Sequence, residues 1–186
     1  MKKRVDLPEK KYEGYIFDLD GTLVDSMPLH YRAWREALAR AGAPDHVFRA
    51  DEFYSCGGKS ANDVVRFLNE RYGMHMDAAS TAADKRRIYL EMLEKEGMQP
   101  IREVVEFVHS LGDAPKAIAT GSAMPGASRT LAAAGLSGLF DVILTPDEVE
   151  HGKPAPDMFL KAAELLGVSP DRCVVFEDAE PGMKAA

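Results

Sequence analysis

Polar side chains that could do chemistry gather at four places in this 186-residue chain, each after a short apolar run. The four places are Asp18-Leu19-Asp20-Gly21-Thr22, Thr120-Gly121-Ser122, Lys153-Pro154 and Glu177-Asp178. Short apolar runs bounded by polar or turn residues are typical of buried strands. Open α/β sheets bind their ligands at the carboxyl ends of the strands. We therefore expect the four clusters to meet at one crevice.

The charges expected in this crevice indicate a divalent cation and a phosphate. Asp18, Asp20, Glu177 and Asp178 place up to four carboxylates near one point, where like charges remain ionised only if cations join them. Lys153 supplies one positive charge. Mg²⁺ suits the remaining negative charge, because it takes oxygen ligands and keeps waters and a substrate phosphate in its coordination shell. A carboxylate nucleophile, a metal, a lysine and a hydroxyl are the parts that phosphoryl transfer needs.

The elements that must position these residues predict a parallel sheet. Runs of strand type cover 15–17, 117–119, 142–144 and 173–176. Between the later runs, apolar residues recur at helical spacing within 101–111, 127–134 and 156–166. Strands that alternate with helices favour an α/β fold, with a parallel sheet that carries helices on its faces.

The stretch from about Pro28 to Gly97 has a different pattern, with three helical patterns and no convincing strand. The helical patterns run through 30–41, 61–72 and 88–95. A helical block inserted after the first strand predicts a small all-α subdomain. We therefore expect a core at 14–27 and 98–186, the helical subdomain at 28–97, and an N-terminal leader at 1–13.

Composition excludes several classes of protein. The chain has 30 acidic and 23 basic residues, a net charge of −7, and so is poorly suited to bind nucleic acid. It lacks an apolar run near the ~20 residues of a membrane span, and its N-terminus lacks the apolar segment of a secretory signal. Cys56, expected near the surface, and Cys173 are too few for a disulfide framework. We expect a cytoplasmic monomer without a nucleic-acid or membrane partner.

Taken in order, the four clusters resemble the motifs of the haloacid dehalogenase superfamily, from Gly14 onward. The helical block resembles the C1 cap of the beta-phosphoglucomutase-like branch. Gly152-Lys153-Pro154-Ala155-Pro156-Asp157 and Val175-Phe176-Glu177-Asp178-Ala179 are further local matches. The resemblance implies a Rossmann-like core with an inserted helical cap. It also implies one more strand of the core beyond Ala186, which this sequence does not contain.

The resemblance also implies roles for the polar residues. It makes Asp18 the nucleophile that forms an aspartyl-phosphate, and Asp20 the general acid and base. It places Mg²⁺ on the Asp18 carboxylate, the backbone carbonyl of Asp20 and Asp178, with Glu177 in a supporting or water-mediated contact. The residues expected at the phosphate are Thr120, Gly121 and Lys153.

Five further residues are candidates for contacting the substrate or positioning the acid/base. They are Ser26, His30, Lys59, Lys85 and Ser122. In the family a histidine near the hinge helps to position the acid/base, whereas a lone histidine on an amphipathic helix is more often half-buried structure than a ligand. The two lysines are expected to reach the substrate from the cap, and the alternatives are a flexible linker for Lys59 and a solvated helix face for Lys85.

Two activities share such a core and differ in what attacks the aspartyl-phosphate. Water makes the enzyme a phosphatase, and a sugar hydroxyl makes it a mutase. Beta-phosphoglucomutases carry Lys-Asn after the second serine of the second motif, where this chain has Ala123-Met124. We therefore expect a Mg²⁺-dependent phosphatase of a small sugar or polyol phosphate, similar to short bacterial fructose-1-phosphate phosphatases. Beta-phosphoglucomutase is the alternative, and a non-catalytic binding member is less favoured because the charged motif residues are intact.

Overall fold

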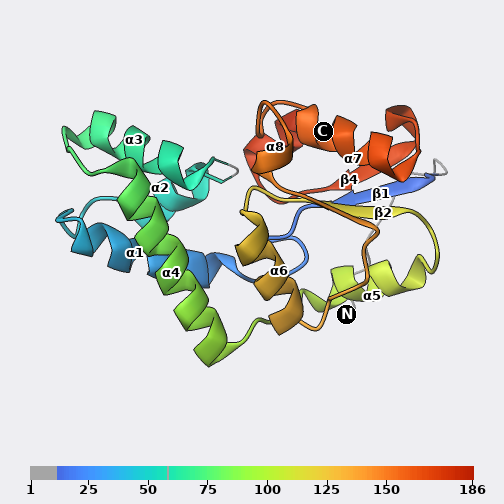
Figure 1. Cartoon of the computed structure of the whole chain (residues 1–186), viewed down its shortest axis with the longest axis horizontal. Coiled ribbons are helices and arrows are strands. Elements are labelled where there is room, and N and C mark those ends of the chain that lie inside the picture. The colour runs from blue at the N-terminus through green and yellow to red at the C-terminus, as the bar shows by residue number, and fades with distance from the viewer. Residues whose placement is uncertain (1–11, 58) are drawn as a thin grey trace.

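A parallel sheet of four strands, in the order β3-β2-β1-β4, lies at the centre of the computed structural model, which describes residues 12–57 and 59–186 (Figure 1). The strands are β1 (Gly14–Phe17), β2 (Lys116–Ala119), β3 (Val142–Leu144) and β4 (Cys173–Phe176). All four predicted strands are present, and the predicted α/β Rossmann-like fold is confirmed. Because β1 pairs with both β2 and β4, the carboxyl ends of these three strands lie side by side.

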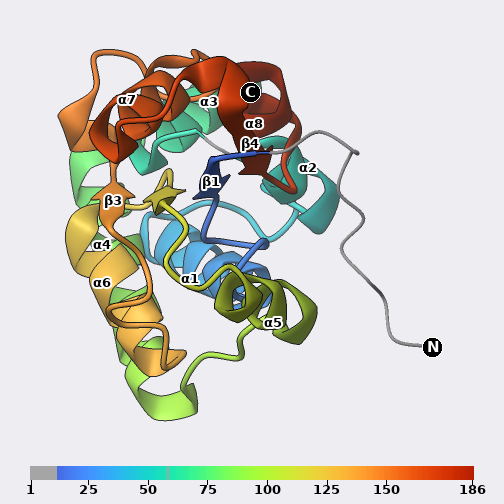
Figure 2. The same cartoon turned by 90° about the vertical axis from the view of Figure 1, so that its right-hand side faces the viewer.

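Successive side chains of the strands face opposite sides of the sheet, and helices bury both sides (Figure 2). Ile16 and Ala117 pack with the apolar faces of α7 and α8. Phe17 and Ile118 pack on the other side with α5 and α6. The four helices are α5 (Arg102–Ser110), α6 (Met124–Ala133), α7 (Asp157–Leu166) and α8 (Glu180–Ala185). The strands are therefore apolar on both faces, which explains why they read as continuous apolar runs.

Four helices between β1 and β2 lie together beside the sheet as a helical cluster, and the first three of them bury a second apolar core (Figure 1). They are α1 (Met27–Arg40), α2 (Ala50–Ser55), α3 (Ala61–Tyr72) and α4 (Ala78–Glu96). Trp34, Phe48 and Leu68 lie in its interior. Burying each such side chain contributes about 1.5–3 kcal/mol. The expectation of three helices was wrong by one, because the six residues of α2 are too few to show a helical period.

Local signals set the ends of these helices. Ser60 precedes α3, and its hydroxyl accepts a hydrogen bond from the backbone N–H of Asp63. Gly167 ends α7 with φ of 69°, a left-handed conformation that glycine adopts without steric cost.

Residues 1–11 of the predicted leader lie outside the described part of the chain. Glu13 belongs instead with the sheet, because its backbone N–H donates to the carbonyl oxygen of Arg172 at 2.9 Å. Within 12–57 and 59–186, no helix combines the length and the hydropathy that crossing a bilayer requires.

Candidate active site

Asp18 follows β1 directly, and a buried lysine holds its carboxylate. The backbone N–H of Asp18 donates to the carbonyl oxygen of Phe176 at 2.9 Å, so β4 fixes the end of β1. Lys153 Nζ donates to Asp18 Oδ1 at 2.7 Å and to Glu177 Oε2 at 2.6 Å. The Lys153 side chain is 1% exposed. One buried ammonium therefore joins two buried carboxylates from the ends of neighbouring strands.

Burial controls the protonation of this group. It raises the pKa of Asp18 to about 8, although the positive charge of Lys153 opposes the shift. Burial also disfavours the charge of Lys153, but Asp18 and Glu177 outweigh it and raise the pKa of the ammonium. The lysine therefore stays charged, and a second positive charge beside Asp18 would keep the aspartate ionised at neutral pH.

The residues around Asp18 fit a hard divalent cation. Asp18, Glu177 and Asp178 each offer one carboxylate oxygen, and these oxygens lie within 4.8 Å of one another. The Thr22 hydroxyl donates to Asp178 Oδ1 at 3.1 Å and orients it. Gly21, with φ of 97°, leaves room for Asp178, because a Cβ there would lie 2.2 Å from Asp178 Oδ2. Clustered carboxylate oxygens are ligands that Mg²⁺ prefers.

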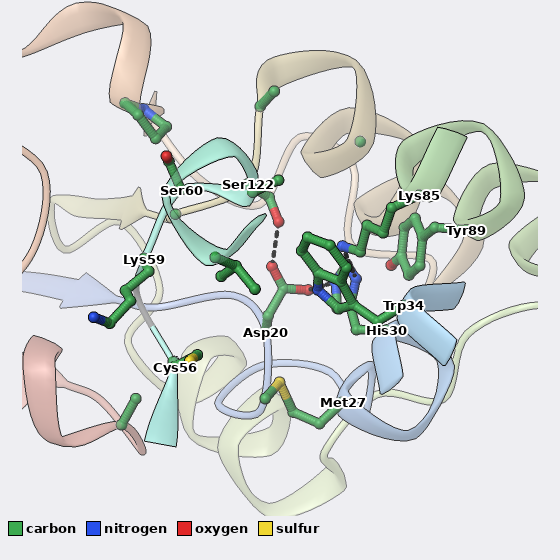
Figure 3. A pocket seen from close by; sticks show the side chains of 18 of the residues that line it. Asp20, Met27, His30, Trp34, Cys56, Lys59, Ser60, Lys85, Tyr89 and Ser122 are labelled. Atoms are coloured by element: carbon green, nitrogen blue, oxygen red, sulfur yellow. Dashed lines mark hydrogen bonds and ion pairs between the residues drawn. The ribbon is translucent and has the colours of Figure 1, made fainter. Parts of the chain in front are cut away.

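Asp20 receives hydrogen bonds on both carboxylate oxygens (Figure 3). Ser26 Oγ donates to Oδ1 at 2.6 Å, and His30 Nε2 lies 3.1 Å from the same oxygen. Ser122 Oγ donates to Oδ2 at 2.6 Å, and Thr120 Oγ1 approaches it at 3.4 Å. The partners come from the start of α1 and from the loop after β2, so two distant segments fix one carboxylate.

These contacts give Asp20 the opposite electrostatic state to Asp18. Burial raises the pKa of Asp20, but His30 and the hydroxyls of Ser122 and Ser26 outweigh it and hold the pKa below its usual range. Asp20 is therefore a carboxylate in this arrangement. A phosphate dianion bound nearby would raise its pKa and favour its protonation.

His30 contacts two residues of α4 on one side and Asp20 on the other (Figure 3). Lys85 Nζ donates to His30 Nδ1 at 2.8 Å, which leaves the proton on Nε2 to face Asp20. Burial, together with Lys85, lowers the pKa of His30, and burial lowers the pKa of Lys85 to about 8. The Tyr89 ring stacks on the imidazole with centroids 4.0 Å apart. His30 is therefore a neutral donor held on three sides.

These groups border a cavity of about 540 Å³ between the sheet and the helical cluster. That volume lies in the range of about 300–1,000 Å³ usual for ligand pockets. Trp34, Phe53 and Tyr54 make part of its wall apolar. Lys59 also lines the cavity, with Nζ 5.1 Å from the centroid of the Phe67 ring, on the side opposite to Lys85 in Figure 3.

All predicted site residues except Thr120 and Ser26 line this cavity. Those two are fully buried beside Asp20. Thr120 was expected at the phosphate, but its hydroxyl faces Asp20 and accepts the backbone N–H of Ser122 at 3.0 Å. Cys56 was expected near the surface, which is wrong: it is buried and lines the cavity, because α2 and α3 pack around it.

Residues that no sequence motif marks also reach the cavity from the helical cluster and from α8. They include Trp34, Phe53, Tyr54, Asn62, Arg86 and Glu180. Trp34 lies within the helical pattern at 30–41, and such a pattern does not distinguish a core face from a cavity wall. Thr22 was missed as a partner of Asp178, although it belongs to the Asp18–Thr22 cluster.

A parallel sheet with an aspartate pair after its first strand, a buried lysine and a second acidic pair is the framework of an enzyme of phosphoryl transfer. The family model of haloacid dehalogenase-like hydrolases matches residues 12–186, and the chain belongs to this family.

Relatives of the chain include phosphatases and mutases. The chain is 36% identical over 178 residues to the fructose-1-phosphate phosphatase YqaB of Escherichia coli, covering 95% of this chain and 92% of YqaB. It is 35% identical over 205 residues to the beta-phosphoglucomutase of Mycobacterium tuberculosis, covering 96% and 78%. The structure of CbbY from Rhodobacter sphaeroides in complex with phosphate superposes with a TM-score of 0.80 at 26% identity, covering 94% and 81%.

Proposed function

We propose that this chain is a Mg²⁺-dependent phosphatase that hydrolyses a small sugar or polyol phosphate through an aspartyl-phosphate on Asp18. One observation carries the proposal: two aspartates border one cavity in opposite electrostatic states. Burial raises the pKa of Asp18 against the effect of Lys153, and His30 together with the hydroxyls of Ser122 and Ser26 holds the pKa of Asp20 low. Paired carboxylates whose environments separate their pKa values are typical of divided acid and base roles. The likeness to YqaB supports the substrate class.

In the first step a carboxylate oxygen of Asp18 attacks phosphorus, and the bond from phosphorus to the leaving oxygen breaks. Asp20 gives its proton to that leaving oxygen. Lys153 lies 2.7 Å from Asp18 and balances the negative charge that gathers there. Mg²⁺ held by Asp18, Asp178 and the backbone carbonyl of Asp20, with Glu177 in support, would neutralise the transferring phosphoryl group.

In the second step water attacks the phosphorus of the aspartyl-phosphate, and the bond from phosphorus to Asp18 breaks. The carboxylate of Asp20 takes the proton of this water and is ready to act again as the acid. Ser26, His30 and Ser122 orient Asp20 in both steps through the hydrogen bonds described above. Inorganic phosphate leaves, and Asp18 returns to its free form.

We assign residues 28–97 to a cap that covers the site and residues 14–27 and 98–186 to the core. This division is supported by the cavity, which both parts line. The leaving group lies under the cap, within reach of Lys59 and Lys85, and the phosphate lies near Lys153 and the loop of Gly121. The net charge of −7 disfavours nucleic acid as a substrate, and we expect a monomer that acts in the cytoplasm.

The test is phosphate release from a panel of sugar and polyol phosphates, with Mg²⁺ and after chelation by EDTA. We expect turnover that needs Mg²⁺ and returns when Mg²⁺ is restored. Asp18→Asn should lower kcat by at least ~10³-fold, as loss of a catalytic nucleophile does. Asp113→Asn, at an exposed aspartate after α5, is the matched control and should keep normal turnover. Normal turnover by Asp18→Asn, or after full chelation, contradicts the proposal.

The mutase alternative is tested by the product. Ala123 precedes α6 and lines the cavity, and its methyl group offers no contact to a second phosphate. We therefore expect beta-glucose 1-phosphate, with a trace of glucose 1,6-bisphosphate, to release phosphate. Glucose 6-phosphate formed in large excess over phosphate would favour the mutase. A failure to hydrolyse even p-nitrophenyl phosphate would favour the non-catalytic binding member.

A further inference from the structure

One buried hydrogen bond joins the helical cluster to a helix of the sheet layer. The Tyr89 hydroxyl of α4 lies 2.7 Å from the Thr130 hydroxyl of α6. Tyr89 is 3% exposed and Thr130 is 1% exposed. Both hydroxyls are removed from water, so each depends on the other to satisfy its hydrogen bonding. The bond therefore holds the Tyr89 side chain at a defined position relative to the sheet.

The other end of this connection is His30. The Tyr89 ring lies flat on the imidazole, with centroids 4.0 Å apart and planes 7° from parallel. The His30 ring plane decides where the Nε2–H points, and that proton faces Asp20 Oδ1 at 3.1 Å. A chain of contacts thus runs from Thr130 through Tyr89 and His30 to Asp20.

We propose that Tyr89 is a positioning residue, anchored by Thr130, which fixes the plane of His30 and thereby aims Asp20 at the leaving oxygen. This role rests on the proposed function, because it requires Asp20 to be the acid. It also ties the position of the cap to the acid: Tyr89 and His30 both belong to the cap and move together, so when α4 lies away from α6 the bond to Thr130 is broken and His30 Nε2 lies away from Asp20. The acid is therefore assembled only when the two parts of the molecule are together.

Apolar packing alone does not explain why the contact between Tyr89 and Thr130 is a hydrogen bond. Tyr89 and its neighbours Leu93 and Leu131 belong to one apolar cluster, where phenylalanine and valine would fill the same space without two polar atoms. Burial and the negative charge of Asp20 raise the pKa of Tyr89, so the phenol stays neutral and keeps its proton for a hydrogen bond. A paired polar contact in an apolar cluster fixes geometry more narrowly than apolar contact does.

The test compares two leaving groups. A sugar alkoxide needs the proton of Asp20 to leave, whereas p-nitrophenolate leaves with little help, so a misplaced acid slows the first step only for the sugar phosphate. The second step needs Asp20 as the base for both substrates, so the comparison uses kcat/KM, which reports the steps up to release of the leaving group. We expect Tyr89→Phe and Thr130→Val each to lower kcat/KM for the best sugar phosphate by about 10-fold, with a much smaller change for p-nitrophenyl phosphate. The double variant should lose no more than either single variant, because the two hydroxyls act as one unit.

Three further variants serve as controls. Tyr72→Phe removes a hydroxyl that donates to Glu52 at 2.9 Å within the helical cluster, away from the cavity, and should leave the ratio of the two kcat/KM values unchanged. Thr130→Ser keeps the hydroxyl and should retain the wild-type ratio. Asp20→Asn sets the scale for complete loss of the acid. All variants are checked for folding by thermal unfolding.

The outcomes separate the two proposals. A selective loss on the sugar phosphate in Tyr89→Phe, Thr130→Val and Asp20→Asn supports the positioning role. A selective loss in Asp20→Asn with equal losses on both substrates in the Tyr89 and Thr130 variants overturns it and leaves the proposed function intact. Equal losses of kcat/KM on both substrates in Asp20→Asn overturn the acid role, and the positioning role with it.

Discussion

Burial and charge act against each other at Asp18, and the balance makes stability depend on pH. In the metal-free protein the folded-state pKa is about 8, against an ordinary value of 3.8, so folding retains a proton that the unfolded chain releases in this window. The free energy of unfolding should therefore fall as pH rises from about 4 to about 8. Burial raises the pKa of Asp178 as well, which acts in the same direction.

The measurement is the Tm against pH in EDTA, for wild type and for Asp18→Asn. Hydrogen bonds lower the pKa of other carboxylates such as Asp20, and these give stability that grows with pH. The difference between the two proteins isolates Asp18: relative to the variant, wild type should lose stability between pH 4 and pH 8. If the stability difference between wild type and Asp18→Asn stays constant across this window, folded Asp18 does not carry the proton that its raised pKa predicts.

Lys153 is the second residue at which burial makes a strong prediction. Its removal by Lys153→Ala leaves Asp18 and Glu177 buried without their shared partner, which should destabilise the protein by about 3–5 kcal/mol. Lys161→Ala breaks an exposed ion pair of similar length, 2.8 Å to Glu164, and should cost about 0–1 kcal/mol. Urea unfolding at neutral pH measures both. Equal effects would show that the burial of Lys153 has no energetic consequence.

At the scale of elements, the strand ends could be predicted from sequence and the contacts between helices could not. Asp18, Lys153 and Glu177 end or follow apolar runs, and the rule that parallel strands end together brings them to one place. The orientation of Thr120 toward Asp20 depends on one side-chain rotamer, which no periodicity encodes. The contact of Tyr89 with Thr130 joins residues 41 positions apart on two helices, and it follows only from how those helices pack.

α8 is short, and it sits so close to Glu177 that one of its residues must be small. A Cβ on Gly182 would lie 2.0 Å from Glu177 Cδ. Gly182→Ala should therefore displace Glu177 from Lys153 and weaken Mg²⁺ binding by about tenfold or more, since it removes a supporting contact of the cation.

The matched control for that change is Gly126→Ala in α6, where a Cβ would meet nothing within 4 Å. Alanine there should leave stability equal or raise it by about 0.5–1 kcal/mol, because glycine is the poorer helix former. Calorimetric titration with Mg²⁺ and thermal unfolding distinguish the two variants. Unchanged Mg²⁺ affinity in Gly182→Ala would show that Glu177 does not support the bound cation.

At the scale of the whole molecule, the site is complete only where the helical cluster meets the sheet. Asp18 and Lys153 come from the ends of the strands and the loops that follow them, whereas His30 and Lys85 come from α1 and α4. The cavity between them is shared, so the distance between the two parts controls how much water surrounds the reacting atoms. Where the parts touch, a side chain of the wrong size should hold them apart.

Gly57, between α2 and α3, lies at such a contact. A Cβ there would lie 3.0 Å from the Cβ of Ala179, in the loop after β4. Gly57→Val should keep the helical cluster from approaching the core and lower kcat/KM for sugar phosphates by about tenfold, with a smaller loss for p-nitrophenyl phosphate, which makes fewer contacts with the cap. Ala179→Gly removes the opposing methyl group, so the double variant should recover much of the lost activity. If Ala179→Gly brings no recovery while Gly57→Val stays folded by thermal unfolding, the contact does not govern closure, and the loop acts on the substrate directly.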